Sequence, residues 1–186
     1  RVYRHARALS ELNAVTAHCS VPPADQQNAR AAVRLWYYPT FSNAYQKLLY
    51  RRPRREGVQV HGVNSFEDLE GLAPSTAGDD ILHLHWLNAV FDNTDEPFES
   101  RAERLLEMVG SRQRASFRVF WTVHNRLNHD SGHPDAERQL RCRLARRVDR
   151  VYVHHPMVPA LLEWWPDEIE PWLCEHGGYD VAPGQT

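Results

Sequence analysis

The feature that most constrains the fold is a regular alternation of apolar, strand-like segments with helical segments. The strand-like runs lie at residues 32–39, 57–63, 79–87, 117–124, 149–155 and 168–179. Segments between them carry apolar residues at helical spacing. The central runs are almost continuously apolar, which is typical of strands covered by helices on both faces. The sequence therefore predicts an α/β fold: a Rossmann-like, doubly wound, mainly parallel sheet of about six strands.

The expected helices have recognisable end signals. A first helix is expected behind a Ser42 cap, and a third behind an Asp135 cap. The second is expected from Ser100 to Gly110, because Ser100 and Glu103 have capping-box spacing and glycine is typical just beyond a helix C-terminus. These helices would cover the sheet.

Length and composition limit the domain organisation and the class of partner. A chain of 186 residues with 42% hydrophobic content fits one core. We expect an N-terminal helical arm at 1–30, a Rossmann-like domain at 31–180 and the start of an interdomain linker at 181–186. The formal charge of -2 gives no general attraction to nucleic acid. Three cysteines without CxxC spacing, and no apolar run of about 20 residues, favour a cytoplasmic location.

Imidazoles gather at the ends of the predicted strands. His85 ends the third strand, His124 the fourth, His154 the fifth and His176 the sixth. The carboxyl ends of parallel strands face one crevice, where ligands bind. We therefore expect these side chains to line one rim of the sheet. His83 lies deeper in its strand, where a buried structural histidine is equally compatible with the pattern.

Several segments together resemble a known family. They are SNAYQKLLYRR, DDILHLHWL, RVFWTVHN with the NHD that follows, VDRVYVHH and EHGGY. In order and spacing they are similar to the N-terminal, acceptor-side domain of bacterial glycosyltransferases of the GT-B fold, from Val33 to Tyr179. The chain differs from the family pattern at Ala44, where Pro is frequent, at Asp130, where Glu is usual, and at Glu175, where Pro is usual.

The resemblance implies half of a two-domain enzyme of bacterial polysaccharide biosynthesis. Such an enzyme transfers a sugar from a nucleotide-sugar donor to a hydroxyl of a glycan or lipid-linked saccharide. The acceptor would bind this domain, and the nucleotide sugar would bind mainly to a second domain beyond the linker. No cofactor or metal is expected in this domain, and the isolated domain is expected to be inactive. The resemblance does not choose between inversion and retention of configuration.

The strand-end residues match that chemistry. A sugar hydroxyl is a weak nucleophile at neutral pH, and imidazole titrates in the range that a general base needs. His124 is therefore the first catalytic candidate and His85 the second. The other candidates are expected to bind the acceptor or another ligand: Asn43, Tyr45, Trp86, Asn125, His129, His154, His176 and Gly177.

Two other functions stay open. His83 and His85 lie two residues apart on a strand and so point to the same side, as two ligands of one metal would. In a metal-dependent hydrolase His124, His129 or Asp130 would complete the site. The second alternative is a non-catalytic carbohydrate-binding module.

Two arginine clusters have simpler interpretations. The first closes the first helix, where cations offset the helix dipole; contact with an anionic inner-membrane surface is the alternative. It consists of Arg51, Arg52, Arg54 and Arg55. The second is expected on the solvent-facing side of the third helix. It consists of Arg138, Arg141, Arg143, Arg146, Arg147 and Arg150.

Overall fold

A computed structural model describes residues 33–76, 79–91, 95–128 and 132–174. They form one six-stranded sheet of order β2-β1-β3-β4-β5-β6, in which every neighbouring pair is parallel. This arrangement confirms the predicted Rossmann-like α/β fold. The expected arm at 1–30 and linker at 181–186 lie outside the described residues.

The strands agree with the apolar runs in the sequence but are shorter at most ends. They are β1 (Arg34–Tyr38), β2 (Gln59–Gly62), β3 (Asp80–Leu84), β4 (Phe117–Thr122), β5 (Arg150–Val153) and β6 (Trp172–Leu173). Every residue of β3 is buried, because this strand lies inside the sheet and both of its faces are covered.

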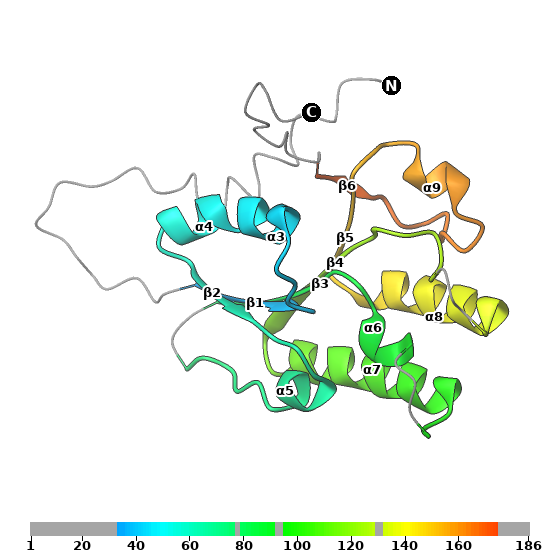
Figure 1. Cartoon of the computed structure of the whole chain (residues 1–186), viewed down its shortest axis with the longest axis horizontal. Helices are drawn as coiled ribbons and strands as arrows, with labels where there is room; N and C mark the ends of the chain where they lie inside the picture. Colours follow the sequence, from blue (N-terminus) through cyan, green and yellow to red (C-terminus); the bar gives the residue numbers. More distant parts are fainter. Residues whose placement is uncertain (1–32, 77–78, 92–94, 129–131, 175–186) are drawn as a thin grey trace, which may run out of the picture.

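Helices cover both faces of the sheet (Figure 1). Helices α3 (Ala44–Leu49) and α4 (Arg51–Arg55) lie on one face. Helices α5 (Phe66–Glu70), α7 (Phe98–Arg114) and α8 (Pro134–Arg147) lie on the other. The short helices α6 (Asn88–Phe91) and α9 (Val158–Leu161) follow β3 and β5. None of the helices in the described ranges is long and apolar enough to cross a membrane.

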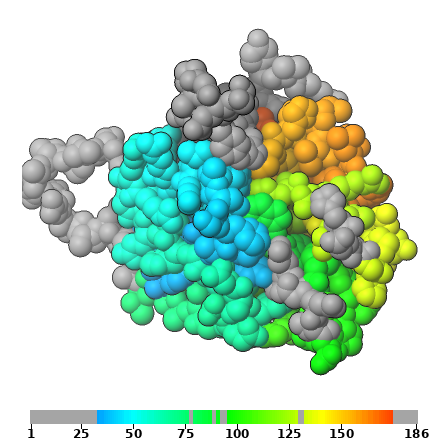
Figure 2. Space-filling view, in the orientation of Figure 1, coloured from blue at the N-terminus to red at the C-terminus, as the bar shows by residue number. Residues whose placement is uncertain are grey.

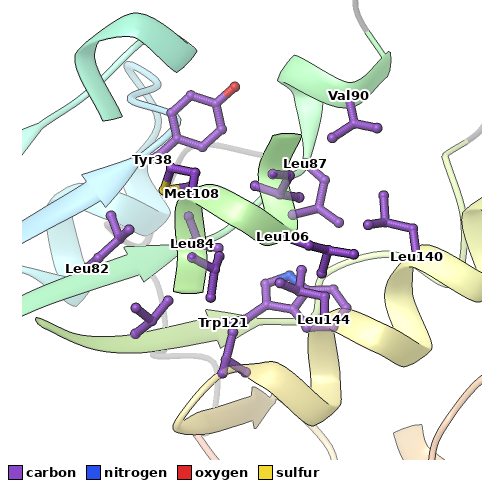
Figure 3. Packing of buried hydrophobic residues seen from close by; sticks show 14 of the residues in the cluster. Tyr38, Leu82, Leu84, Leu87, Val90, Leu106, Met108, Trp121, Leu140 and Leu144 are labelled. Atoms are coloured by element: carbon purple, nitrogen blue, oxygen red, sulfur yellow. The ribbon is translucent and has the colours of Figure 1, made fainter. Parts of the chain in front are cut away.

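The larger core lies between the sheet and α5, α7 and α8. Strand side chains such as Leu82 and Trp121 pack there against helix side chains such as Leu106 and Leu144 (Figure 3). Leu82, Trp121 and Leu144 are completely buried. Burial of each such side chain is worth about 1.5–3 kcal/mol, so this face supplies most of the apolar stabilisation.

The smaller core lies under α3 and α4, on the opposite face of the sheet. Its members are Leu35, Tyr37, Tyr50, Ile81, Phe120 and Tyr152. Successive strand residues point to opposite faces. Strand β3 therefore contributes Leu82 to the larger core, while Ile81 and His83 face the smaller one.

The helix ends differ from the expected ones. Asn43, and not Ser42, caps α3, since its side chain accepts a hydrogen bond from the Gln46 amide. Helix α8 begins at Pro134 with no side-chain cap, so Asp135 lies in its first turn. Proline suits the first helical position because the amide it lacks would have no partner inside the helix.

Helix α7 is longer than predicted at both ends. It starts at Phe98, whose buried ring belongs to the larger core, and it continues past Gly110. A side chain at position 110 would collide with the guanidinium of Arg147. Gly110 therefore leaves room for the end of the Arg147 side chain and does not end the helix. Glu103 forms no capping box; it pairs with Arg143 of α8, whose Nη2 lies 2.9 Å from Oε2.

Candidate functional site

The sheet order places a topological switch point between β1 and β3. The chain leaves β1 for β2 on one side and reaches β3 on the other, so the segments that follow β1 and β3 diverge at their carboxyl ends. Ligands bind at such switch points in open parallel sheets. Figure 2 shows the blue segment after β1 beside the green and yellow-green segments that follow β3 and β4. The rings of Phe41 and Trp86 lie 5.1 Å apart across this junction.

A pocket of about 170 Å³ opens at this edge of the sheet. Its wall combines aromatic and aliphatic groups with imidazoles, amides and one guanidinium. The lining residues are His85, Trp86, Leu87, Phe91, His124, Asn125, Asn128 and Arg141. Four of the candidates from the sequence thus share one pocket. They are His85, Trp86, His124 and Asn125.

His124 is held between Trp86 and His85. Its ring stacks on the indole of Trp86, with centroids 4.2 Å apart and planes 16° apart. Its Nε2 lies 3.1 Å from Nδ1 of His85, which is hydrogen-bond distance. His85 is buried, whereas His124 is only half-buried. His124 is thus the imidazole of this pair that is more accessible to a ligand in the pocket.

Tyr50 links His83, in β3, to His85, which directly follows β3. Its hydroxyl lies 2.5 Å from Nε2 of His85 and 2.9 Å from Nδ1 of His83. The other ring nitrogen of His83, Nε2, lies 2.8 Å from the Thr122 hydroxyl. A continuous chain of hydrogen bonds therefore runs from Thr122 to His124.

Burial keeps the inner members of this chain uncharged. Burial, and secondarily the charge of His154, lowers the pKa of His83 to about 3. Burial, followed by His83 and the other nearby imidazoles, lowers the pKa of His85 well below its usual value. Burial also raises the pKa of Tyr50 well above its ordinary value. At neutral pH each inner imidazole therefore carries one N–H, and Tyr50 carries its hydroxyl proton.

These protonation states order the hydrogen bonds. The buried Tyr50 hydroxyl has one proton, which it donates to one of its two imidazole neighbours while the other donates to it. All bonds from Thr122 to His124 then run in one direction. The neutral His85 consequently fixes the position of the His124 ring through a defined hydrogen bond.

Two further candidates lie beside this chain. Tyr45 presents its ring edge-on to His124 and His154, with centroid distances of 5.0 and 5.4 Å. Nδ1 of His154 donates to the carbonyl oxygen of Cys174 at 2.7 Å. Asn43 uses its side-chain oxygen to cap α3. His129, His176 and Gly177 lie outside the described residues.

The position of Arg141 differs from the one that the sequence predicts. The sequence predicts that Arg141 lies on the solvent side of α8, but only 5% of it is exposed and it lines the pocket. Its Nε donates to Oε1 of Glu137 at 2.8 Å, and its Nη1 donates to the carbonyl of Asn125 at 3.2 Å. Position 137 lies four residues before 141, so the two charges meet on the buried side of the helix.

Glu137 ties the segment after β4 to α8. Its side chain is completely buried, and its Oε1 also accepts a hydrogen bond of 2.7 Å from the backbone amide of Asn128. The same ion pair therefore holds both Asn125 and Asn128 at the pocket. Breaking a buried ion pair costs about 3–5 kcal/mol, so this part of the wall is well fixed.

Most of the other arginines are as the sequence predicts, but Arg138 is half-buried, and Arg150 lies in β5, not on the helix, with its guanidinium over the ring of Trp172. Arg143, Arg146 and Arg147 are exposed on α8. The four arginines of α4 are also exposed, and Arg52 pairs with Glu56 at 2.7 Å. Such surface pairs contribute at most about 1 kcal/mol each.

The arrangement does not favour the metal-site alternative. All four ring nitrogens of His83 and His85 already have side-chain hydrogen-bond partners. Across the part of the chain that the structure describes, no group of three or more His, Cys, Asp or Glu residues is placed to hold a metal ion. His129 and Asp130, two of the ligands considered above, lie outside that part.

Comparisons with known proteins do not assign the chain to a family. No family model, curated protein or solved structure matches the chain. A parallel α/β sheet of this kind supports many unrelated activities, so the function has to be inferred from the residues that line the pocket.

Proposed function

We propose that this chain is the acceptor-side domain of a glycosyltransferase. The enzyme would move a sugar from a nucleotide-sugar donor to a hydroxyl of a saccharide or lipid-linked saccharide. The observation that carries the proposal is the pocket beyond the carboxyl ends of β3 and β4, where Trp86 stacks on His124. An aromatic surface suits the apolar face of a sugar ring, and the neighbouring imidazole and amides suit its hydroxyl groups.

His124 supplies the acid–base group in this proposal. The acceptor hydroxyl loses its proton to His124 while its oxygen forms the new bond to the anomeric carbon of the donor sugar. The bond from that carbon to the phosphate oxygen of the donor breaks, and the nucleotide, such as a nucleoside diphosphate, leaves with the electron pair. In a retaining enzyme His124 would instead donate a hydrogen bond to the donor sugar.

His85 and Tyr50 position that base. The neutral His85 ring holds His124 at 3.1 Å, and Tyr50 holds His85 from below. A base that is oriented by a second buried group is the usual arrangement for activating a hydroxyl nucleophile. The nucleotide sugar would be bound mainly by a second domain, and the exposed arginines of α4 would allow contact with an anionic membrane surface that carries a lipid-linked acceptor.

Saccharide binding by the purified chain tests the proposal. The variant W86A should weaken binding about tenfold, because a stacked aromatic ring contributes about 1 kcal/mol or more. W36A is a matched control, since Trp36 stacks on His61 with centroids 4.4 Å apart but is not part of the pocket wall. Titrations of a saccharide panel followed by NMR would measure both variants.

Three outcomes would count against the proposal. The first is a folded chain that binds no saccharide of the panel, and the second is equal weakening by W36A and W86A. The third is stoichiometric zinc or manganese in protein purified without an affinity tag. That result would favour the metal-dependent hydrolase instead.

A further inference from the structure

We infer that the pocket binds an anionic group, a carboxylate or a phosphate, on the guanidinium of Arg141. For the identity of the ligand as a saccharide, the inference rests on the proposed function. Among the described residues that line the pocket, Arg141 is the one with a permanent charge. The preferred ligand would therefore be an acidic sugar, either a uronate or a sugar phosphate.

The guanidinium is already fixed in place. It donates from Nε to Glu137 and from Nη1 to the Asn125 carbonyl, which uses two of its five N–H donors. Its central carbon lies 6.0 and 5.7 Å from the ring centres of Trp121 and Trp164, neither of which lines the pocket. A rigid, planar cation with remaining N–H groups is the arrangement that recognises carboxylate and phosphate oxygens.

Glu137 does not cancel this preference. Glu137 is completely buried and does not line the pocket, whereas Arg141 does. A ligand therefore meets the cation before the carboxylate. A buried ion pair is usually no more stabilising than apolar side chains of the same size. Holding the segment after β4 uses only two of the five N–H groups of Arg141, so the remaining ones can serve ligand recognition.

The size of the pocket limits the kind of anion. Its volume of about 170 Å³ is well below the roughly 300–1,000 Å³ of sites that enclose a whole drug-sized ligand. One sugar ring with its acidic group fits this space better than a complete nucleotide. Asn125 and Asn128 add amide groups on the same wall.

The position next to His124 gives the anion a second effect. Both Arg141 and His124 line the pocket, so a bound anion would lie near the imidazole. A nearby negative charge favours the protonated form of an imidazole. An acidic acceptor would thereby strengthen His124 as a base for its own hydroxyl.

Three sugars of similar size test the inference on the whole chain. D-glucuronate supplies a carboxylate, D-glucose 6-phosphate supplies a phosphate, and D-glucose is neutral. We expect one of the acidic sugars to bind at least about tenfold more tightly than glucose in NMR or calorimetric titrations at low salt. The acidic sugar that binds more tightly tells which anion the site takes.

Variants of α8 assign the preference to Arg141. The double variant E137Q/R141M removes both charges and leaves no lone buried ion. It should bind the acidic sugar and glucose about equally. R138M is the matched control, because Arg138 lies on the same helix, pairs with Asp135 at 2.6 Å and does not line the pocket. Its preference should equal that of the wild type. R141K keeps the charge without the planar fork and should keep part of the preference, which provides a second test if the double variant does not fold.

The outcomes separate this inference from the proposed function. Equal binding of all three sugars would overturn the inference and leave saccharide binding intact. A preference that persists in folded E137Q/R141M would also overturn it, and so would an unchanged preference in R141K if the double variant does not fold. Binding of inorganic phosphate that depends on Arg141, with no binding of any sugar, would support the anion site and contradict the sugar-transfer proposal. Failure of every probe to bind the folded wild type would contradict both.

Discussion

The two faces of the sheet are built from different chemistry. The larger core under α5, α7 and α8 consists mainly of aliphatic side chains such as Leu82 and Leu144, together with tryptophans. The smaller core under α3 and α4 is largely aromatic, and its Tyr50 is hydrogen-bonded to His83 and His85. One face therefore stabilises the domain by apolar burial, and the other holds polar groups in fixed orientations. The pocket lies at the end of strands that serve both.

The largest expected effect comes from the larger core. Replacing the completely buried Leu144 by Ala should lower the free energy of unfolding by about 3–5 kcal/mol, because it leaves a cavity that its neighbours cannot fill. L49A is the matched change on the other face, where the side chain is half-buried, and it should cost about half as much. Urea unfolding measures both values, and an equal loss would remove the distinction between the faces.

The second effect is a dependence of stability on pH that comes from the smaller core. The pKa of His83 is about 3 in the folded chain and about 6.5 when unfolded, so the unfolded chain binds the proton more readily. Stability is therefore full above about pH 6.5 and falls as the pH drops toward 3. Between pH 7 and pH 5 the loss from His83 should be about 2 kcal/mol.

Unfolding experiments at the two pH values measure this loss. His85, whose pKa is also lowered by burial, acts in the same direction. The variant H83Q should have a clearly weaker pH dependence than the wild type. An unchanged dependence in H83Q would contradict the assignment to His83.

The smallest expected effect concerns the hydroxyl of Tyr50. Y50F removes the oxygen that bonds both His83 and His85, so it should lower stability by about 1–2 kcal/mol. Y37F removes a hydroxyl from the neighbouring ring of the same core and should cost less than about 0.5 kcal/mol.

Nitrogen NMR of the imidazoles gives a more direct measurement. In the wild type His85 should be a single tautomer, whereas in Y50F it should be a mixture, because its Nε2 has lost its partner. A single unchanged tautomer in Y50F would show that Tyr50 does not order the chain. Y37F should leave the His85 signals as they are.

The sequence predicts the sheet well because burial on both faces leaves a direct trace in it. Largely apolar runs such as residues 117–122, in which Val119, Phe120 and Trp121 are consecutive, fit neither surface strands nor surface helices. The sequence also predicts where these strands end, because the polar residues His85 and His124 end the apolar runs at the edge of the sheet. The fold and the position of the pocket therefore follow from local patterns.

Other parts of the site depend on contacts between distant segments. Arg141 was expected in solvent, although Glu137, Leu140, Arg141 and Leu144 recur at the spacing of one helix face, which is the signal that could have found it. Tyr50 was missed because it lies at the junction of α3 and α4, and its direction is set by the packing of both helices on the sheet. The choice of Asn43 over Ser42 as a cap likewise depends on the path of the loop.

The order of the strands has a consequence for the newly synthesised chain. The residues that line the pocket come from three separate segments: the one after β3 with His85, the one after β4 with His124, and helix α8 with Arg141. The pocket therefore lacks part of its wall until α8 has emerged and docked, and a ligand can be captured only after that point. Because a ligand that binds only the native state stabilises it by mass action, its capture would act as a final check that assembly is complete.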